Sequence, residues 1–218
     1  MDMETFTIVR NISILSVILP LIFFILALRK PQQPATVKLL GALIFASGLS
    51  DFICLILYKY FRINSNPVIL VYVVMQYILL SLVYRNAYTL RGFKKMTIAG
   101  IIVFVAFAVV NLFFVQGMER LNSNAFSISS GVLMFYCLVY FYQLFQELPE
   151  PYIERMFMFW VSAAVFIYFG TNLFLFATVD RLIDKNDNQF LLSWALHNGS
   201  NAFKNVVFAI AMYIAGRK

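Results

Sequence analysis

The stretch LLSWALHNGSNAFKNVVFAIAMYIA, residues 191–215, is apolar along most of its length and carries His197, Asn201, Lys204 and Asn205 near its middle. Its length matches the roughly 17–25 residues that a helix needs to cross a hydrocarbon core. An ionisable group at membrane depth costs roughly 2.5–3.5 kcal/mol on insertion scales, so such groups normally face a bundle interior or a wet cavity. The stretch therefore predicts a membrane-spanning helix with a functional polar face.

The composition of the whole chain agrees with a membrane protein. Hydrophobic residues make up 62% of the 218 residues, charged residues make up 12%, and the mean hydropathy is +0.82. An average soluble domain is about 45–50% apolar and about 25% charged. A chain of this composition would not stay dissolved in water.

Six further stretches have the length and apolar character of a membrane span: residues 8–28, 37–58, 67–88, 97–115, 127–147 and 156–178. The connections between them are short and rich in turn-forming residues, and they leave no room for a soluble domain. The sequence thus predicts an all-α fold, a polytopic seven-helix bundle that forms a single transmembrane domain over residues 1–218.

The lysines and arginines predict the orientation of this bundle. With the N-terminus outside, ten basic residues lie on the cytoplasmic side: Arg29, Lys30, Lys38, Arg85, Arg91, Lys94, Lys95, Arg155, Arg217 and Lys218. Six lie on the other side: Arg10, Lys59, Arg62, Arg120, Arg181 and Lys185. The positive-inside rule therefore favours an outer N-terminus and a cytoplasmic C-terminus. Because the net charge of +7 is divided between two membrane faces, it does not indicate nucleic-acid binding.

The residue types and motifs of the chain give little support for an enzymatic site. A zinc site needs about three protein ligands, whereas the chain has one histidine and no cysteine cluster. Ser200 and Lys204 are four residues apart, but no nucleophile-elbow motif accompanies them, and no glycine-rich phosphate loop is present. We therefore expect a protein that is not an enzyme, with no catalytic residues, no metal and no cofactor.

Polar residues within the spans are the candidates for a ligand-binding or proton-binding pocket, because lipid cannot satisfy their donors and acceptors. The candidates are Asp51, Gln76, Asn111, Asn172, His197, Asn201, Lys204 and Asn205. A rise of about 1.5 Å per residue puts Asp51, Asn111, Asn172 and His197 in the outer half of the membrane. We therefore predict an outward-opening polar pocket whose floor is an ion pair between Asp51 and Lys204.

Structural interpretations of the same residues remain open. Asp51 and Lys204 can form a purely structural ion pair, and a lone histidine is often a hydrogen-bonding core residue and not a pH switch. Tyrosines on residues 127–147 favour packing and interhelical hydrogen bonds over an aromatic ligand box. We expect Tyr140, Phe141 and Tyr142 to seal the cytoplasmic side of the bundle.

A lysine in the seventh helix invites comparison with microbial rhodopsins, but the similarity is remote. In that family an aspartate stands four positions before the retinal-binding lysine, and here that position is Ser200. The predicted third helix has no carboxylate counterion, and the sixth has no proline between residues 156 and 178. A bound retinal is therefore not expected.

A closer resemblance rests on two motifs. The first is FW at 159–160, YF at 168–169 and NLFLF at 172–176; the second is Trp194, His197, Asn201, Lys204, Asn205 and the FAI of 208–210. Together they resemble a group of small uncharacterised bacterial seven-helix integral membrane proteins. The resemblance implies a multi-pass protein of a bacterial inner membrane and implies no particular chemistry.

Two functional hypotheses follow from the polar pocket. The first is a non-enzymatic sensor or receptor-like module that binds a small-molecule ligand and signals through a separate membrane or cytoplasmic partner. The alternative is a small-solute or proton-coupled transporter, because a buried aspartate, lysine and histidine can carry protons. The interruptions expected in the helices, Pro20 and Gly199, are not paired between two halves of the chain, which argues against a carrier built from repeats.

Overall fold

The computed structural model describes residues 2–30, 32–117, 122–147, 152–183 and 187–217, and the side chains of these residues apart from 178–188 and 190. Every regular element in these ranges is helical, and no strand occurs in them. The first half contains α1 (Met3–Ser16), α2 (Ile18–Ala27), α3 (Ala35–Ile56), η1 (Leu57–Phe61), α4 (Asn66–Ala87) and α5 (Arg91–Val110). The second half contains η2 (Asn111–Val115), α6 (Ser123–Glu147), η3 (Ile153–Arg155), α7 (Phe157–Ile183) and α8 (Asp187–Arg217).

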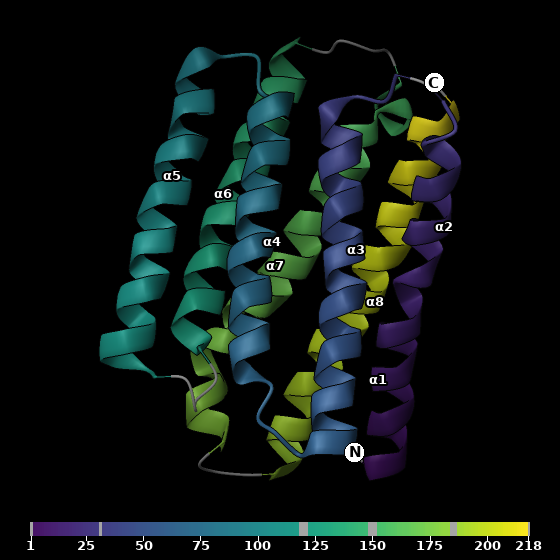
Figure 1. Cartoon of the computed structure of the whole chain (residues 1–218). Helices are drawn as coiled ribbons and strands as arrows, with labels where there is room; N and C mark the ends of the chain where they lie inside the picture. The colour runs from purple at the N-terminus through teal and green to yellow at the C-terminus, as the bar shows by residue number, and fades with distance from the viewer. Residues whose placement is uncertain (1, 31, 118–121, 148–151, 184–186, 218) are drawn as a thin grey trace.

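The helices lie side by side with their axes roughly aligned, and together they form an elongated bundle (Figure 1). Among the described residues, six segments are long and apolar enough to cross a membrane: Met3–Ala27, Ala35–Phe61, Asn66–Ala87, Arg91–Val115, Ser123–Glu147 and Phe157–Ala177. Their bounds agree closely with the first six predicted spans. Most begin a few residues earlier than predicted because the polar residues that flank the apolar run are helical too.

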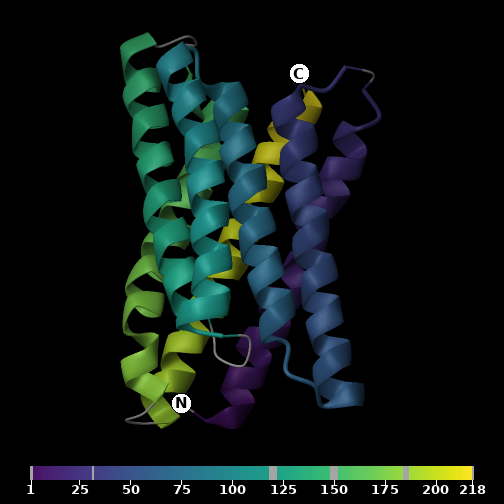
Figure 2. The same cartoon turned by 60° about the vertical axis from the view of Figure 1, so that its left-hand side comes forward.

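The seventh predicted span lies within α8, which is 31 residues long but is not among those six segments. His197, Asn201, Lys204 and Asn205 lower the hydropathy of this helix. Its polar residues are covered because α8 packs against α1, α2 and α7. The two termini lie at opposite ends of the bundle, as both views show (Figures 1 and 2).

The first span is interrupted, so that it forms two helices. The break falls at Val17, between α1 and α2, and Pro20 follows three residues later. Because proline has no N–H, Pro20 cannot donate to the carbonyl of Ser16, and the regular hydrogen-bond ladder ends there. Of the two interruptions expected from the sequence, Pro20 has a break beside it, whereas Gly199 lies within the continuous helix α8, so that expectation was wrong.

Large apolar side chains cover the outside of the bundle. Residues such as Ile12, Ile22, Phe52 and Ile102 are exposed, in contrast to a water-soluble domain, which rarely presents such a continuous apolar surface. The interior holds aliphatic residues together with tyrosines of α4 and α6, whose hydroxyls form hydrogen bonds. The Tyr88 hydroxyl, for example, donates to the carbonyl of Tyr136 at 2.8 Å. Within residues 127–147, Tyr136 and Tyr140 are buried in the apolar core, which agrees with the predicted packing role.

Candidate functional site

Lys204 lies in the interior of the bundle, on the face of α8 that turns toward α7. Its side chain is only 3% exposed. The ammonium donates a hydrogen bond to the Asn201 side-chain oxygen at 2.6 Å and lies 4.3 Å from the ring centroid of Tyr168. A hydrogen bond and a cation–π contact thus replace part of the hydration that the buried cation has lost.

Two asparagines of α8 join it to α1. The Asn201 amide donates to the Ser13 hydroxyl at 2.9 Å, and the Asn205 amide donates to the Ser16 hydroxyl at 2.8 Å. Both serines lie in the last turn of α1, directly before the break in the first span. The asparagines were predicted from the sequence, but the serines were not. The spacing of three residues between the serines, which puts both on one face of the helix, was the available signal.

Asp51 projects from α3 toward the same interior. It is half-buried, and within the described part of the chain it accepts no hydrogen bond and forms no ion pair. Its charge nevertheless interacts with that of Lys204. The predicted floor, an Asp51–Lys204 ion pair, is not found as a direct contact among the described residues, and the hydrogen bond of the ammonium goes to Asn201. The two charges face one interior without neutralising each other by contact.

Gln76 of α4 belongs to the same group of residues. Its amide donates to the Tyr72 hydroxyl at 3.1 Å, and its side chain also interacts with Tyr168 of α7. Tyr72 in turn interacts with the charge of Asp51. Tyr72 was not among the predicted site residues, since a tyrosine in an apolar helix is ordinary and gives no signal of its own.

His197 and Asn172 form a direct contact, with 2.6 Å between His197 Nδ1 and Asn172 Oδ1. The Asn172 amide nitrogen donates to the Tyr168 carbonyl at 2.7 Å, so its oxygen is the acceptor for the histidine. His197 therefore carries its proton on Nδ1, which leaves a lone pair on Nε2. Aromatic rings enclose the imidazole, with centroids 5.3 Å away for Trp194 and 5.6 Å away for Phe176.

We call this assembly the interior polar cluster. It comprises Asp51, Tyr72, Gln76, Tyr168, Asn172, His197, Asn201, Lys204 and Asn205, from α3, α4, α7 and α8, with two serines of α1 attached. The cluster can offer one anionic, one cationic and several neutral hydrogen-bonding groups to a ligand. Seven of the eight candidates from the sequence belong to it.

The eighth candidate, Asn111, lies elsewhere. Its amide donates to Gln116 at 2.9 Å and to Asn122 at 3.1 Å, and its oxygen accepts from Asn124 at 3.2 Å. This network joins η2 to the start of α6 and shapes the α5–α6 connection. Placing Asn111 in the pocket was wrong, because similar depth does not fix the position of a helix around the bundle, and α5 packs mainly on α4.

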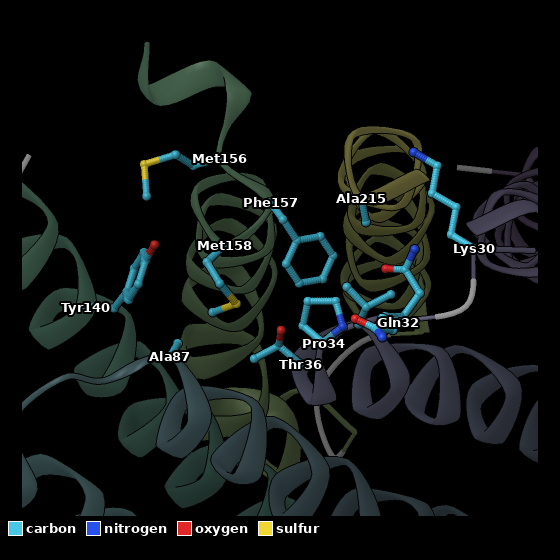
Figure 3. Close-up of a pocket in the computed structure, with 12 residues that line it drawn as sticks. Lys30, Gln32, Pro34, Thr36, Ala87, Tyr140, Met156, Phe157, Met158 and Ala215 are labelled. Carbon is cyan, nitrogen blue, oxygen red and sulfur yellow. The ribbon is translucent and has the colours of Figure 1, made fainter. Parts of the chain in front are cut away.

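A cavity of about 620 Å³ lies at the end of the bundle that holds the C-terminus (Figure 3). Its lining combines residues of the α2–α3 connection and the start of α3 with residues of α6, α7 and α8, among them Lys30, Gln32, Thr36, Tyr140, Phe157 and Ala215. This cavity was not predicted from the sequence. The predicted pocket opens toward the other end of the bundle.

An apolar layer separates this cavity from the interior polar cluster. Along α8, the eleven residue steps from Lys204 to Ala215 correspond to about 16 Å. On its inward face α8 carries Phe208 and Met212, which are buried and belong to the same apolar core as Leu40 and Ile44 of α3. We predicted that Tyr140, Phe141 and Tyr142 seal the cytoplasmic side of the bundle. This prediction is wrong, because Tyr140 lines the cavity and Tyr142 is 62% exposed.

No group of three or more His, Cys, Asp or Glu side chains in the described ranges could hold a metal ion. Comparisons with protein-family models, with curated proteins and with solved structures give no match to this chain. The resemblance to small bacterial seven-helix membrane proteins therefore stays a prediction from its motifs.

Replacing Asn172 with leucine should lower the free energy of unfolding by about 1–2 kcal/mol, because the His197 N–H loses its acceptor inside the bundle. Trp194 emission should shift as well, since its ring packs edge-to-face on that imidazole. The measurement is denaturation of the detergent-solubilised protein with fluorescence detection. Thr171→Val is the matched control, because the Thr171 hydroxyl bonds only to the Ile167 carbonyl of its own helix. Equal losses in both variants would contradict the assigned contact.

Proposed function

We propose that the chain crosses a bacterial inner membrane seven times, with its N-terminus outside and its C-terminus in the cytoplasm. An odd number of crossings agrees with termini at opposite ends of the bundle (Figure 2). The distribution of basic residues supports the orientation, since most of them belong to connections at the end that holds the C-terminus. In this arrangement α8 is the seventh span, and its polar residues are tolerated because they face other helices.

Cysteine labelling at Asn64 and Gly92 tests this orientation. Both positions are exposed in connections or helix ends, and the chain has only two native cysteines, Cys54 and Cys137. In a background without an accessible cysteine, Asn64→Cys should react with a membrane-impermeant maleimide in intact cells. Gly92→Cys should react only after the cells are permeabilised. The reverse pattern would invert the orientation.

We propose that the protein is a non-enzymatic, receptor-like binding module whose site is the interior polar cluster. One observation carries this proposal: Asp51 and Lys204 face the same interior with opposite charges and without a direct ion pair. Charged groups in a membrane interior are costly unless they are compensated. A small polar solute with both a donor and an acceptor, such as an amino acid, would bridge these two groups and complete their hydrogen bonding.

The route of the signal is part of the same proposal. Ligand binding would favour one arrangement of α3 and α8, the helices that carry the two charges, over another. Both helices continue through the apolar layer to the 620 Å³ cavity, where Val37 and Ala215 contribute to the lining. The bundle end around this cavity is therefore the proposed contact surface for a separate membrane or cytoplasmic partner.

Trp194 provides a built-in reporter for ligand binding. Its ring packs against His197, and Trp160 is the only other tryptophan of the chain. In a Trp160→Phe protein, we expect at least one of the twenty common amino acids to change Trp194 emission saturably. Asp51→Asn should abolish this change, whereas Thr171→Val should preserve it. A response that persists in Asp51→Asn would remove the interior polar cluster from the proposal.

A transporter is the second candidate function, and the arrangement of the cluster and the cavity favours it. A polar cluster on one side of an apolar layer and a cavity on the other side is what a carrier closed toward one face would present. Proteoliposomes decide between the two functions, with the amino acids that alter Trp194 emission as the solutes and with or without a proton gradient. Binding without uptake supports the receptor. Saturable uptake that Asp51→Asn abolishes would replace it with the transporter.

A further inference from the structure

A second hollow of about 410 Å³ lies between the end of α4 and the start of α5. Its lining comprises Arg85, Lys94, Lys95, Ile98, Ala99 and Ile102. It shares no residue with the interior polar cluster or with the 620 Å³ cavity. Three of the six residues are cationic, and no carboxylate of the described chain contributes to the lining.

The basic residues of this hollow repel one another, and the local backbone does not relieve that repulsion. Lys94 and Lys95 belong to the first turns of α5, where the helix dipole is positive and cations are unfavourable. No side chain caps this helix end with a hydrogen bond. An anion held between Arg85 and the two lysines would offset these interactions.

The other half of the lining is aliphatic, and its residues follow one another along α5. Ile98 and Ile102 are one turn apart on α5, and they are 37% and 66% exposed. They follow the lysines along the segment Arg91–Val115, which is apolar enough to cross a membrane. The cationic half therefore lies at the bundle end, and the aliphatic half extends from it toward the membrane interior.

We propose that this hollow binds an anionic phospholipid, with its phosphate between Arg85, Lys94 and Lys95 and an acyl chain along Ile98 and Ile102. Basic pockets between transmembrane helices at the membrane surface suit anionic lipid headgroups. A free phosphate ion would use only the cationic half, and a water-soluble acidic peptide would leave the isoleucines exposed to water. The amphiphilic lining matches a lipid, and this proposal does not depend on the receptor function.

The test compares lipids on the full-length protein in dodecyl maltoside. Dioctanoyl phosphatidylglycerol should bind saturably in native mass spectrometry and raise the melting temperature, and dioctanoyl phosphatidylcholine should do so at least about tenfold more weakly. Glycerol 3-phosphate, which lacks acyl chains, should have no effect at the same concentration. Stabilisation by glycerol 3-phosphate equal to that by the lipid would show a free-anion site and overturn the proposal.

Two variants locate the binding. The triple variant Arg85→Gln, Lys94→Gln, Lys95→Gln should lose phosphatidylglycerol binding by tenfold or more. Its control, Arg29→Gln, Lys38→Gln, Arg217→Gln, removes the same charge from exposed residues at the same bundle end and should retain binding. Ala99→Phe keeps every charge and fills the hollow, and it should also lose binding. Equal weakening in both triple variants, or full binding by Ala99→Phe, would refute the site.

Discussion

Replacing Lys204 with methionine should lower the free energy of unfolding by about 2–3 kcal/mol, although methionine fills a similar volume in an apolar interior. The substitution removes the donor to Asn201 and the cation beside Tyr168, and it leaves the charge of Asp51 without a compensating charge. Reversible denaturation in detergent provides the measurement. Lys38→Met is the control, because Lys38 is exposed near the start of α3 and should change stability by less than about 0.5 kcal/mol.

A double-mutant cycle with Asp51→Asn separates the charge interaction from the hydrogen bond. Asp51→Asn alone should also destabilise the protein, because it leaves the Lys204 cation uncompensated. The double variant should lose less than the sum of the two single losses, by about 1 kcal/mol, since neither charge then lacks its partner. Additive losses would mean that Asp51 and Lys204 do not share a site, and the receptor proposal would lose the observation that carries it.

Replacing Gly100 with alanine should lower the free energy of unfolding by about 2 kcal/mol through overpacking. A Cβ at this position would overlap the Tyr136 hydroxyl and lie 3.0 Å from the Tyr77 hydroxyl. Tyr136 cannot turn away easily, because it is only 2% exposed and its hydroxyl contacts that of Tyr77. Thermal denaturation in detergent measures the loss.

Two further variants test the cause of this loss. Gly92 belongs to the same helix, and a Cβ there meets nothing within 4 Å, so Gly92→Ala should be neutral or stabilise by up to about 1 kcal/mol. Tyr136→Phe removes the overlapping oxygen and should therefore recover part of the stability of Gly100→Ala. A Gly100→Ala protein as stable as the wild type would show that α5 moves away from α4 and α6 at little cost.

The spans could be predicted from the sequence because the thickness of the bilayer fixes their length and its apolar core fixes their composition. Six of the seven predicted stretches meet both conditions in the structure, and the seventh, in α8, forms a helix of sufficient length. The break at Val17 could also be predicted in part, because Pro20 has no N–H and therefore interrupts the hydrogen-bond ladder of a helix.

The site could be predicted only in part, because a helical sequence gives depth and face but not lateral position. Asn111 illustrates the limit: its depth resembles that of Asp51, but its helix packs at the edge of the bundle. Lys204 illustrates a second limit. Its ammonium donates a hydrogen bond to Asn201 of the same helix, whereas the sequence predicted a contact with a carboxylate of a different helix. Tyr72 could not be identified as a site residue from the sequence, and Ser13 could be identified only weakly. The role of each residue depends on which helices pack against its own helix.

The hydrogen bonds between α1 and α8 have a consequence for how the protein is made. Asn201 is 188 residues from Ser13, and Asn205 is 189 residues from Ser16, so α1 is synthesised long before α8, the helix that supplies its hydrogen-bond partners. The polar residues of α8 are also synthesised after α1, α2 and α7, the helices that cover them in the fold. Translation order thus lets a helix that lipid alone would accept poorly enter a prepared protein environment.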